Sequence, residues 1–161
     1  MGYFFNQPDL YEKITIYFQP LNIFIKRPSP LWIEPLEPYY GGPVVVLIDN
    51  ATFSSGEGIP MAIQHLPQGA VIGFYGTYGS FGMTGGLVQL PEGLTLHFPD
   101  GQSLDAQDII QLDSNNALHG GVSPSIHVPL TEENARALFL DNQDVLLDIA
   151  INYLGENQAL K

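Results

Sequence analysis

The sequence contains no cysteine and no apolar run that approaches the roughly 18 residues of a membrane-spanning helix. Because no such run is present, we expect no membrane insertion. Without cysteine the chain has no disulfide, no thiolate metal ligand and no cysteine nucleophile, although this absence assigns no cellular compartment. The first residues carry no basic region ahead of an apolar stretch, so they do not read as a signal peptide. No group of Asp and His has the spacing of metal ligands, so we predict neither a metal nor another cofactor.

Basic residues are also scarce. The 161 residues include five Lys plus Arg against seventeen Asp plus Glu, which gives a formal net charge of -12. Nucleic-acid binding needs clustered cations that neutralise phosphates, and docking on anionic lipid needs a basic segment, so the composition argues against both. The 45% hydrophobic content and the length fit one domain with a core of its own.

A strand–helix–strand pattern occupies the middle of the chain. Residues 43–49 form an unbroken apolar, β-branched run, which is typical of a strand buried on both faces. We predict a helix over 55–66, ended by the turn residues 67–69, and a second buried strand over 70–74. This order predicts a βαβ unit with a parallel sheet.

Shorter signals flank this unit. Residues 1–40 are rich in aromatics and proline, and we assign them to an N-terminal segment of the same domain, whose core spans 41–161. Residues 28–40 read as a long irregular connection, and 101–118 carry no clear signal. The remaining predicted elements are short strands at 14–18, 22–25 and 126–129, a hairpin over 86–98, a helix that begins after Thr131, and a helix over 144–154.

The segment after the first buried strand carries the most informative chemistry. Ser54 lies where a helix is predicted to begin, beyond the carboxyl end of a parallel strand, where sites tend to form. Unpaired backbone N–H groups and the positive end of the helix dipole would stabilise an oxyanion there. However, Ser54 and Glu57 also have the Ser-x-x-Glu form of a capping box, which many helices carry without any catalysis. The segment alone leaves both interpretations open.

A wider, ordered set of segments resembles the catalytic core of S41-type (tail-specific, C-terminal-processing) serine peptidases. The resemblance covers about residues 40–154 and rests on Gly42–Asp49, Ser54–Glu57, Val71–Gly73, Thr77–Ser80, Leu90–Gly93, Gly121–Pro129 and Asn142–Leu146. It implies an α/β fold with a ClpP/crotonase-like core, mostly parallel, with a β-hairpin and C-terminal helices. It also implies a peptide or protein substrate, and export to the cell envelope.

The resemblance assigns roles to named residues. Ser54 takes the position of the nucleophile, Glu57 that of the acidic residue in the first helical turn, and Ser55 that of a backbone oxyanion donor. In the family the second oxyanion donor comes from a glycine-rich turn earlier in the chain, which this sequence does not show. We therefore expect the chain to be the C-terminal part of a peptidase domain whose N-terminal part is missing, and we expect it to have negligible activity alone.

The general base is the main departure from the family pattern. In the processing branch a lysine should follow Thr77-Tyr78-Gly79, but Ser80 stands there, and no lysine occurs between Lys26 and Lys161. Either a histidine base comes from outside this chain, as in the tricorn-like branch, or the site has lost its base. Among the local histidines, His119 precedes two glycines in an irregular loop and is the one freest to reach a site. His65, His97 and His127 are expected to be structural or exposed, and Ser80 could serve as a hydrogen-bonding surrogate near Ser54.

Two further functions compete with an enzyme. The fold could serve as a non-catalytic module that binds a peptide or an apolar ligand, which the missing lysine favours. An acyl-CoA-handling, crotonase-like function is weaker, because CoA phosphates would need more basic residues. The glycine-rich stretch 76–86 lacks the Gly-Lys-Ser/Thr of a phosphate-binding loop, so we expect its glycines to let an extended peptide approach the backbone.

Overall fold

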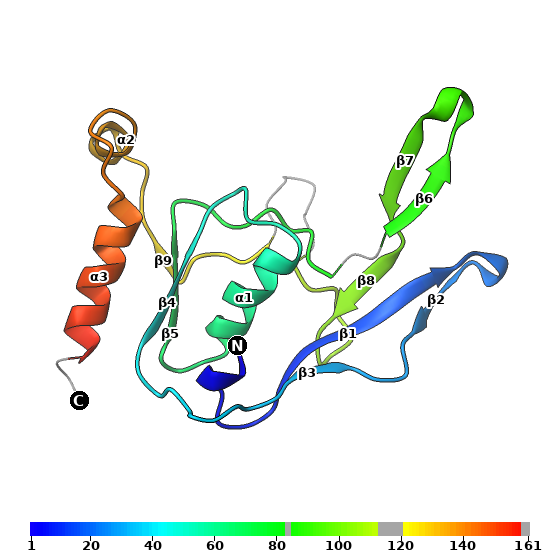
Figure 1. Cartoon of the computed structure of the whole chain (residues 1–161), viewed down its shortest axis with the longest axis horizontal. Coiled ribbons are helices and arrows are strands. Elements are labelled where there is room, and N and C mark those ends of the chain that lie inside the picture. The colour runs from blue at the N-terminus through cyan, green and yellow to red at the C-terminus, as the bar shows by residue number, and fades with distance from the viewer. Residues whose placement is uncertain (83–84, 113–120, 159–161) are drawn as a thin grey trace.

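The computed structural model describes residues 1–82, 85–112 and 121–158. It shows a mixed α/β domain in which a small parallel sheet lies between two helices (Figure 1). Two β-hairpin arms project from the side of the molecule away from the C-terminal helix (Figure 1). This arrangement confirms the predicted fold class.

The parallel sheet is the predicted βαβ unit with one further strand. Strand β4 (Val44–Ile48) pairs with β5 (Gly69–Gly73), and β5 pairs with β9 (Ile126–His127), in the order β4-β5-β9. Helix α1 (Ser55–Gln64) connects β4 to β5 and contacts both strands. Helix α3 (Val145–Gln158) contacts the same two strands from the other side of the sheet (Figure 1).

The hydrophobic core follows these two interfaces. One cluster joins Met61 of α1 to Ile48 and Val71 of the sheet, and a second joins Ala150 of α3 to Ile72 and Val128. Because both faces of the sheet are covered, the continuous apolar runs of β4 and β5 are explained. A third cluster joins Phe5, Ile33 and Ala62, so the aromatic N-terminal segment packs on α1.

Antiparallel pairing is more extensive than the sequence predicts. Strand β1 (Asp9–Phe18) begins five residues before the expected start and pairs with β2 (Ile23–Lys26), β3 (Leu31–Ile33) and β8 (Gly101–Leu104). Strands β3 and β8 lie in stretches that carried no strand signal, because each is three or four residues long and is fixed by pairing with β1 rather than by its own pattern.

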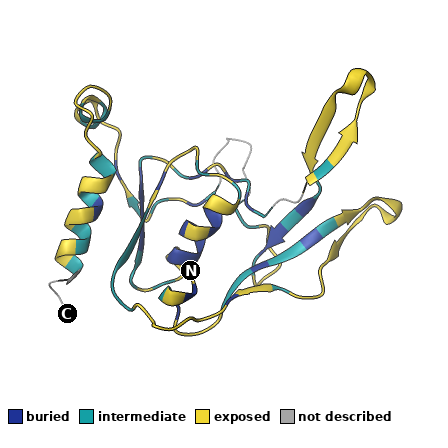
Figure 2. Ribbon diagram, in the orientation of Figure 1, coloured by how far each residue is buried: buried dark blue, intermediate teal, exposed yellow. Residues whose placement is uncertain are grey.

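The two arms expose most of their surface (Figure 2). One arm is the β1–β2 hairpin, turned by the 3-10 helix η2 (Gln19–Leu21), and the other is the hairpin of β6 (Gly85–Gln89) and β7 (Thr95–Pro99), turned by η3 (Pro91–Gly93). Val88, Leu96 and Phe98 share one face of the second arm and are all exposed. A two-stranded hairpin has only marginal stability without further packing. The exposed apolar side chains of these arms are therefore available to pack against a neighbouring segment or molecule.

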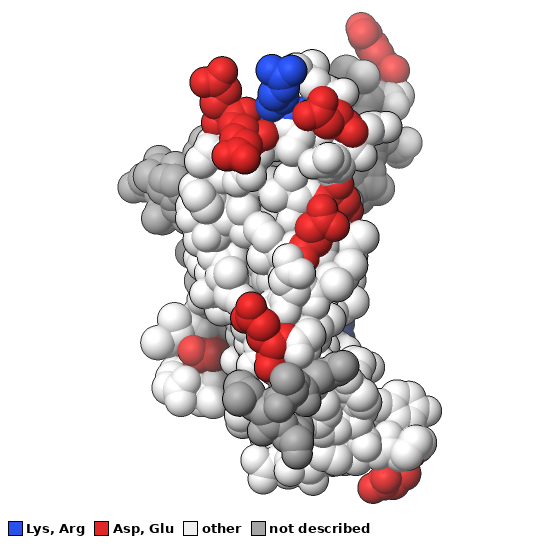
Figure 3. Space-filling model, turned by 90° about the vertical axis from the view of Figure 1, so that its left-hand side faces the viewer, with Lys and Arg blue, Asp and Glu red and all other residues white. Residues whose placement is uncertain are grey.

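The remaining elements are η1 (Gly2–Phe4) and helix α2 (Glu132–Phe139). The Thr131 hydroxyl accepts the Asn134 N–H and caps α2, as the sequence predicts. The face of the molecule turned toward the viewer in Figure 3 carries scattered carboxylates and few basic side chains, in keeping with the net charge of -12.

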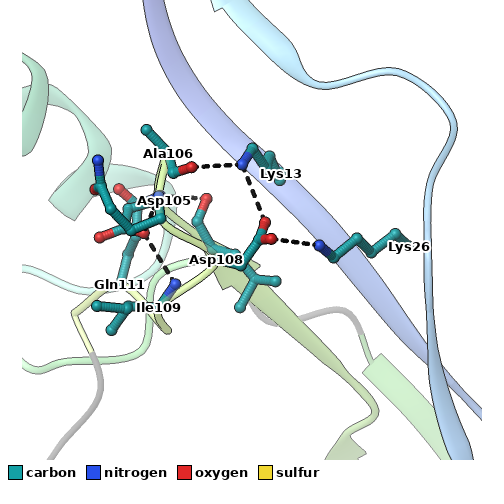
Figure 4. Close-up of polar contacts among 9 residues, drawn as sticks. Lys13, Lys26, Asp105, Ala106, Asp108, Ile109 and Gln111 are labelled. Atoms are coloured by element: carbon teal, nitrogen blue, oxygen red, sulfur yellow. Dashed lines mark hydrogen bonds and ion pairs between the residues drawn. The ribbon is translucent and has the colours of Figure 1, made fainter.

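A small ionic network ties the first arm to the turn after β8 (Figure 4). Lys13 Nζ donates to the Ala106 carbonyl at 2.7 Å and to Asp108 Oδ1 at 3.0 Å, and Lys26 Nζ lies 2.6 Å from Asp108 Oδ2. Asp105 Oδ1 accepts the Ile109 N–H and shapes the turn itself. Hydrogen bonds from Lys26 and then Lys13 hold the pKa of Asp108 below its ordinary value.

We expect Asp108→Asn to lower the melting temperature slightly at neutral pH and low salt. The folded-state pKa of Asp108 is depressed, so its contribution to stability is present above the unfolded pKa of about 4 and is lost as the pH falls through the folded pKa. Because the pair is exposed, salt should screen it. Thermal unfolding measured at pH 7 and at pH 2.5 checks this. A difference between wild type and variant that persists at pH 2.5 would contradict it.

Candidate active site

Ser54 occupies an unusual backbone position directly after the turn that follows β4. It is the N-cap residue of α1, with φ 54° and ψ -127°, and it is half-buried. An ordinary N-cap residue has extended, negative-φ backbone, whereas this conformation is the one that type II′ turns reserve for glycine. A serine held there carries local strain, which persists only where the surroundings impose it. The capping box that the sequence suggested is present, since Glu57 Oε2 accepts the Ser54 N–H at 3.0 Å, but a capping box does not require this backbone conformation.

The Glu57 carboxylate is the centre of the polar network around Ser54. Its side chain is fully buried, at 0% exposure. Oε1 accepts the Thr77 hydroxyl at 2.6 Å and the Gly79 N–H at 2.5 Å. Oε2 accepts the N–H groups of Ser54 at 3.0 Å and Ser80 at 2.7 Å, and the Ser80 hydroxyl at 3.3 Å. A buried carboxylate with five donors stabilises the loops that supply them.

Thr77 extends this network to a third segment of the chain. Its Oγ1 accepts the Val122 N–H at 2.7 Å, so its own hydroxyl proton is directed to Glu57. Gly121 has φ +72°, and a Cβ there would overlap Thr77. Glu57 therefore joins the α1 turn, the loop after β5 and the segment before β9. No role for Thr77 or Val122 could be predicted, because nothing in a sequence shows that a hydroxyl bridges two distant segments.

The predicted site residues Ser54, Glu57 and Ser80 lie together. The Ser54 N–H is shared between Glu57 Oε2 and Ser80 Oγ, with the latter at 3.2 Å. The Ser55 N–H, in contrast, has no hydrogen-bond partner among the residues that the structure describes. Ser55 itself is exposed at the first turn of α1. The Ser54 N–H is thus engaged by two acceptors, whereas the Ser55 N–H is not engaged by any described residue.

Of the described histidines, only His65 lies at α1, at the end opposite Ser54. His65 Nδ1 lies 2.6 Å from Asp9 Oδ2 at the far end of α1, about 16 Å of helix away. This pair borders a cleft of about 370 Å³ that also includes Met61, Asp105 and Gln111 but none of the predicted site residues. His97 and His127 lie in β7 and β9 and are exposed. His119 lies outside the described residues.

The described residues contain no helix long and apolar enough to cross a membrane. They also contain no group of three or more His, Cys, Asp or Glu that could hold a metal ion.

The fold and the site together define a class of protein, namely a mixed α/β domain with a polar site at the carboxyl edge of its parallel strands. The sequence model of peptidase family S41 matches residues 11–128. The chain therefore belongs to peptidase family S41, and the domain is of the peptidase type. None of the curated protein sequences compared with this chain matches it.

Solved structures share the fold. A candidate peptidase from Parabacteroides merdae ATCC 43184 matches with a TM-score of 0.72 and 22% identity, over 95% of this chain and 45% of that chain. Mature CPAF matches with a TM-score of 0.59 and 16% identity, over 84% of this chain and 36% of that chain. This chain thus spans less than half the length of either structure.

Proposed function

We propose that this chain is the part of a serine peptidase domain that carries the nucleophile, Ser54. The observation that supports this most strongly is the left-handed backbone of Ser54 at the start of α1. A sharp turn with φ above zero exposes a hydroxyl above a sheet edge, as the nucleophile elbow of other hydrolases does. An ordinary helix cap needs no such strain, so strain at this one serine points to function.

In the proposed reaction, Ser54 Oγ attacks a peptide carbonyl carbon and its proton passes to a general base. The base then gives that proton to the leaving amine as the C–N bond breaks, and water hydrolyses the remaining acyl ester. The oxyanion would be stabilised by the Ser55 N–H, which is unpaired in the described structure and lies at the positive end of α1. Peptides or proteins are the substrates that the family implies.

Glu57 and Ser80 take positioning roles in this proposal. Both Glu57 oxygens are occupied by donors, and the carboxylate is fully buried, so it does not serve as the base. Ser80 stands where the processing branch has lysine, and among the described residues its hydroxyl hydrogen-bonds the Ser54 N–H and the Glu57 carboxylate. We place the base in polypeptide outside this chain, which the partial coverage of both solved structures supports. Within the chain the candidate is His119, which lies outside the described residues.

Labelling with a fluorophosphonate tests this proposal. We expect the purified chain alone to label slowly and to hydrolyse peptides negligibly, because no base is present. Imidazole added at about 100 mM should raise labelling at least tenfold by acting as a base that enters from solvent. Ser54→Ala should abolish the imidazole-dependent signal, whereas Ser55→Ala, which keeps the backbone N–H, should retain it. Labelling that imidazole does not change, or that survives in Ser54→Ala, would contradict the proposal.

A non-catalytic binding module is the second candidate. It is favoured by the serine at position 80, whose hydroxyl fills the space beside the Ser54 amide. In that case the fluorophosphonate would leave Ser54 unmodified with or without imidazole, although the same turn would still be present.

A further inference from the structure

Two aromatic residues stand exposed beside Ser54, on the segments that follow β4 and β5. The Tyr78 N–H donates to the Thr52 carbonyl at 2.9 Å. The Ser54 N–H donates to Ser80 Oγ at 3.2 Å. The two segments therefore run side by side at the carboxyl edge of the parallel sheet (Figure 1). Phe53 and Tyr78, one on each segment, are both 65% exposed.

The backbone that carries these two rings is held by the Glu57 network. On one segment, Thr77 and Gly79 are buried and donate to the carboxylate, and the intervening Tyr78 faces outward. On the other, Phe53 immediately precedes the serine whose N–H the same carboxylate accepts. An aromatic side chain has only two rotatable bonds, so a ring on fixed backbone loses little entropy when it binds a partner. Exposed aromatics mounted in this way are suited to anchor a ligand.

We propose that Phe53 and Tyr78 form a subsite for an apolar side chain of the substrate, on a residue beside the scissile bond. This inference rests on the proposed function of Ser54, and it narrows the substrate class to peptides with a large aliphatic or aromatic residue at the point of cleavage. Binding removes apolar surface of the rings and of the peptide from water together. A polypeptide segment seated permanently on both rings would occupy the space beside Ser54 that the substrate needs, so the peptide itself is the occupant.

The charges of this part of the chain favour an uncharged side chain. No lysine or arginine occurs between Arg27 and Arg136, so this long stretch supplies neither cation to pair with an acidic side chain. Between residues 41 and 82 the acidic residues are Asp49 and Glu57, and both are engaged by donors of their own surroundings. A substrate aspartate or lysine would therefore lose hydration here without gaining a partner. The net charge of -12 further disfavours acidic peptides.

Peptide binding to the Ser54→Ala chain tests the subsite without any covalent chemistry. The probes are blocked pentapeptides, acetyl-Gly-Gly-X-Gly-Gly-amide, in which X is Phe, Asp or Lys. In NMR titrations the Phe peptide should bind about tenfold more tightly than the other two and should shift the ring signals of Phe53 and Tyr78. Adding Phe53→Ser should reduce this preference to about threefold or less, whereas Phe53→Leu, which keeps an apolar side chain, should retain it.

The matched control is Phe139→Ser, the same change at a 72% exposed position of α2, a helix that contacts α3. It should leave the peptide preference unchanged. Labelling of the wild-type chain in imidazole gives a second readout, because an octyl fluorophosphonate should react about tenfold faster than one with a triethylene glycol chain. Phe53→Ser and Tyr78→Ser should each lower this ratio, and Phe139→Ser should not.

The two experiments separate the subsite from the nucleophile. Equal binding of the three peptides, or a preference that Phe53→Ser leaves unchanged, would overturn the subsite even if Ser54 is labelled. So would peptide-induced shifts that appear at other rings, such as Phe98 of the β6–β7 arm, and not at Phe53 or Tyr78. Apolar peptides that bind at these two rings in a chain that no fluorophosphonate labels would support the subsite and overturn Ser54 as the nucleophile.

Discussion

Glu57→Gln is expected to lower the free energy of unfolding by about 3 kcal/mol and to reduce imidazole-dependent labelling of Ser54 at least tenfold. The carboxylate is fully buried and accepts from donors on both oxygens. Glutamine replaces one carboxylate oxygen, an acceptor, with an NH₂ group, a donor. That NH₂ group would face protein donors, and neither partner would then have an acceptor. Hydroxyls can rotate away, but the backbone N–H of Gly79 or of Ser80 cannot.

The control for this variant is Glu156→Gln, which changes the same group at an exposed position of α3. It should change the free energy of unfolding by no more than about 0.5 kcal/mol. Urea unfolding of both proteins, together with labelling under conditions where each is fully folded, separates stability from positioning. A Glu57→Gln protein as stable as wild type would show that the carboxylate does not hold the three segments together.

Ser54→Gly is expected to be more stable than wild type by about 1 kcal/mol and to lose all imidazole-dependent labelling. Glycine adopts φ 54°, ψ -127° without the strain of about 1–3 kcal/mol that a residue with a Cβ carries there. Glycine loses more backbone entropy on folding than serine does, which costs about 0.5–1 kcal/mol, so the relief of strain is the larger effect. Ser54→Ala keeps the Cβ, so it should gain no such relief. Stability bought by losing a functional residue is a common trade-off at active sites.

The same pair of variants separates the two interpretations of this helix start. If Ser54 were an ordinary cap, Ser54→Ala would lose about 1 kcal/mol and Ser54→Gly a few tenths, because a capping hydroxyl would be missing in both. The order of stability in urea unfolding is therefore diagnostic. A Ser54→Gly protein less stable than wild type would contradict the strained backbone on which the proposed function rests.

The parallel core could be predicted from the sequence because its signals are local. The apolar runs over 43–49 and 70–74 and the turn residues after the helix define β4, α1 and β5 to within a few residues. The grouping of Ser54, Glu57 and Ser80 was also expected, although only from the resemblance to S41 peptidases. Spacing within one helical turn explains the Ser54–Glu57 pair, but not the presence of Ser80.

Other features depend on contacts between distant segments, and the sequence does not show them. Strands β3 and β8 are short and exist because β1 offers them backbone partners. The bridge from Glu57 through Thr77 to Val122 joins three segments through one hydroxyl. The left-handed conformation of Ser54 was not expected either, since a serine in a Ser-x-x-Glu pattern ordinarily has extended backbone. The roles of Ser54, Ser55, Glu57, Ser80 and His119 all stay predictions.

The crystal structure of the chain after fluorophosphonate treatment in imidazole tests the central claim most directly. The proposal predicts a phosphonyl group on Ser54 Oγ, a Ser54 φ near +54°, and a phosphoryl oxygen that accepts the Ser55 N–H. It also predicts that Glu57 keeps its contacts with Gly79 and Ser80. A Ser54 with negative φ and an unmodified hydroxyl, or a phosphonyl group on another residue, would contradict it.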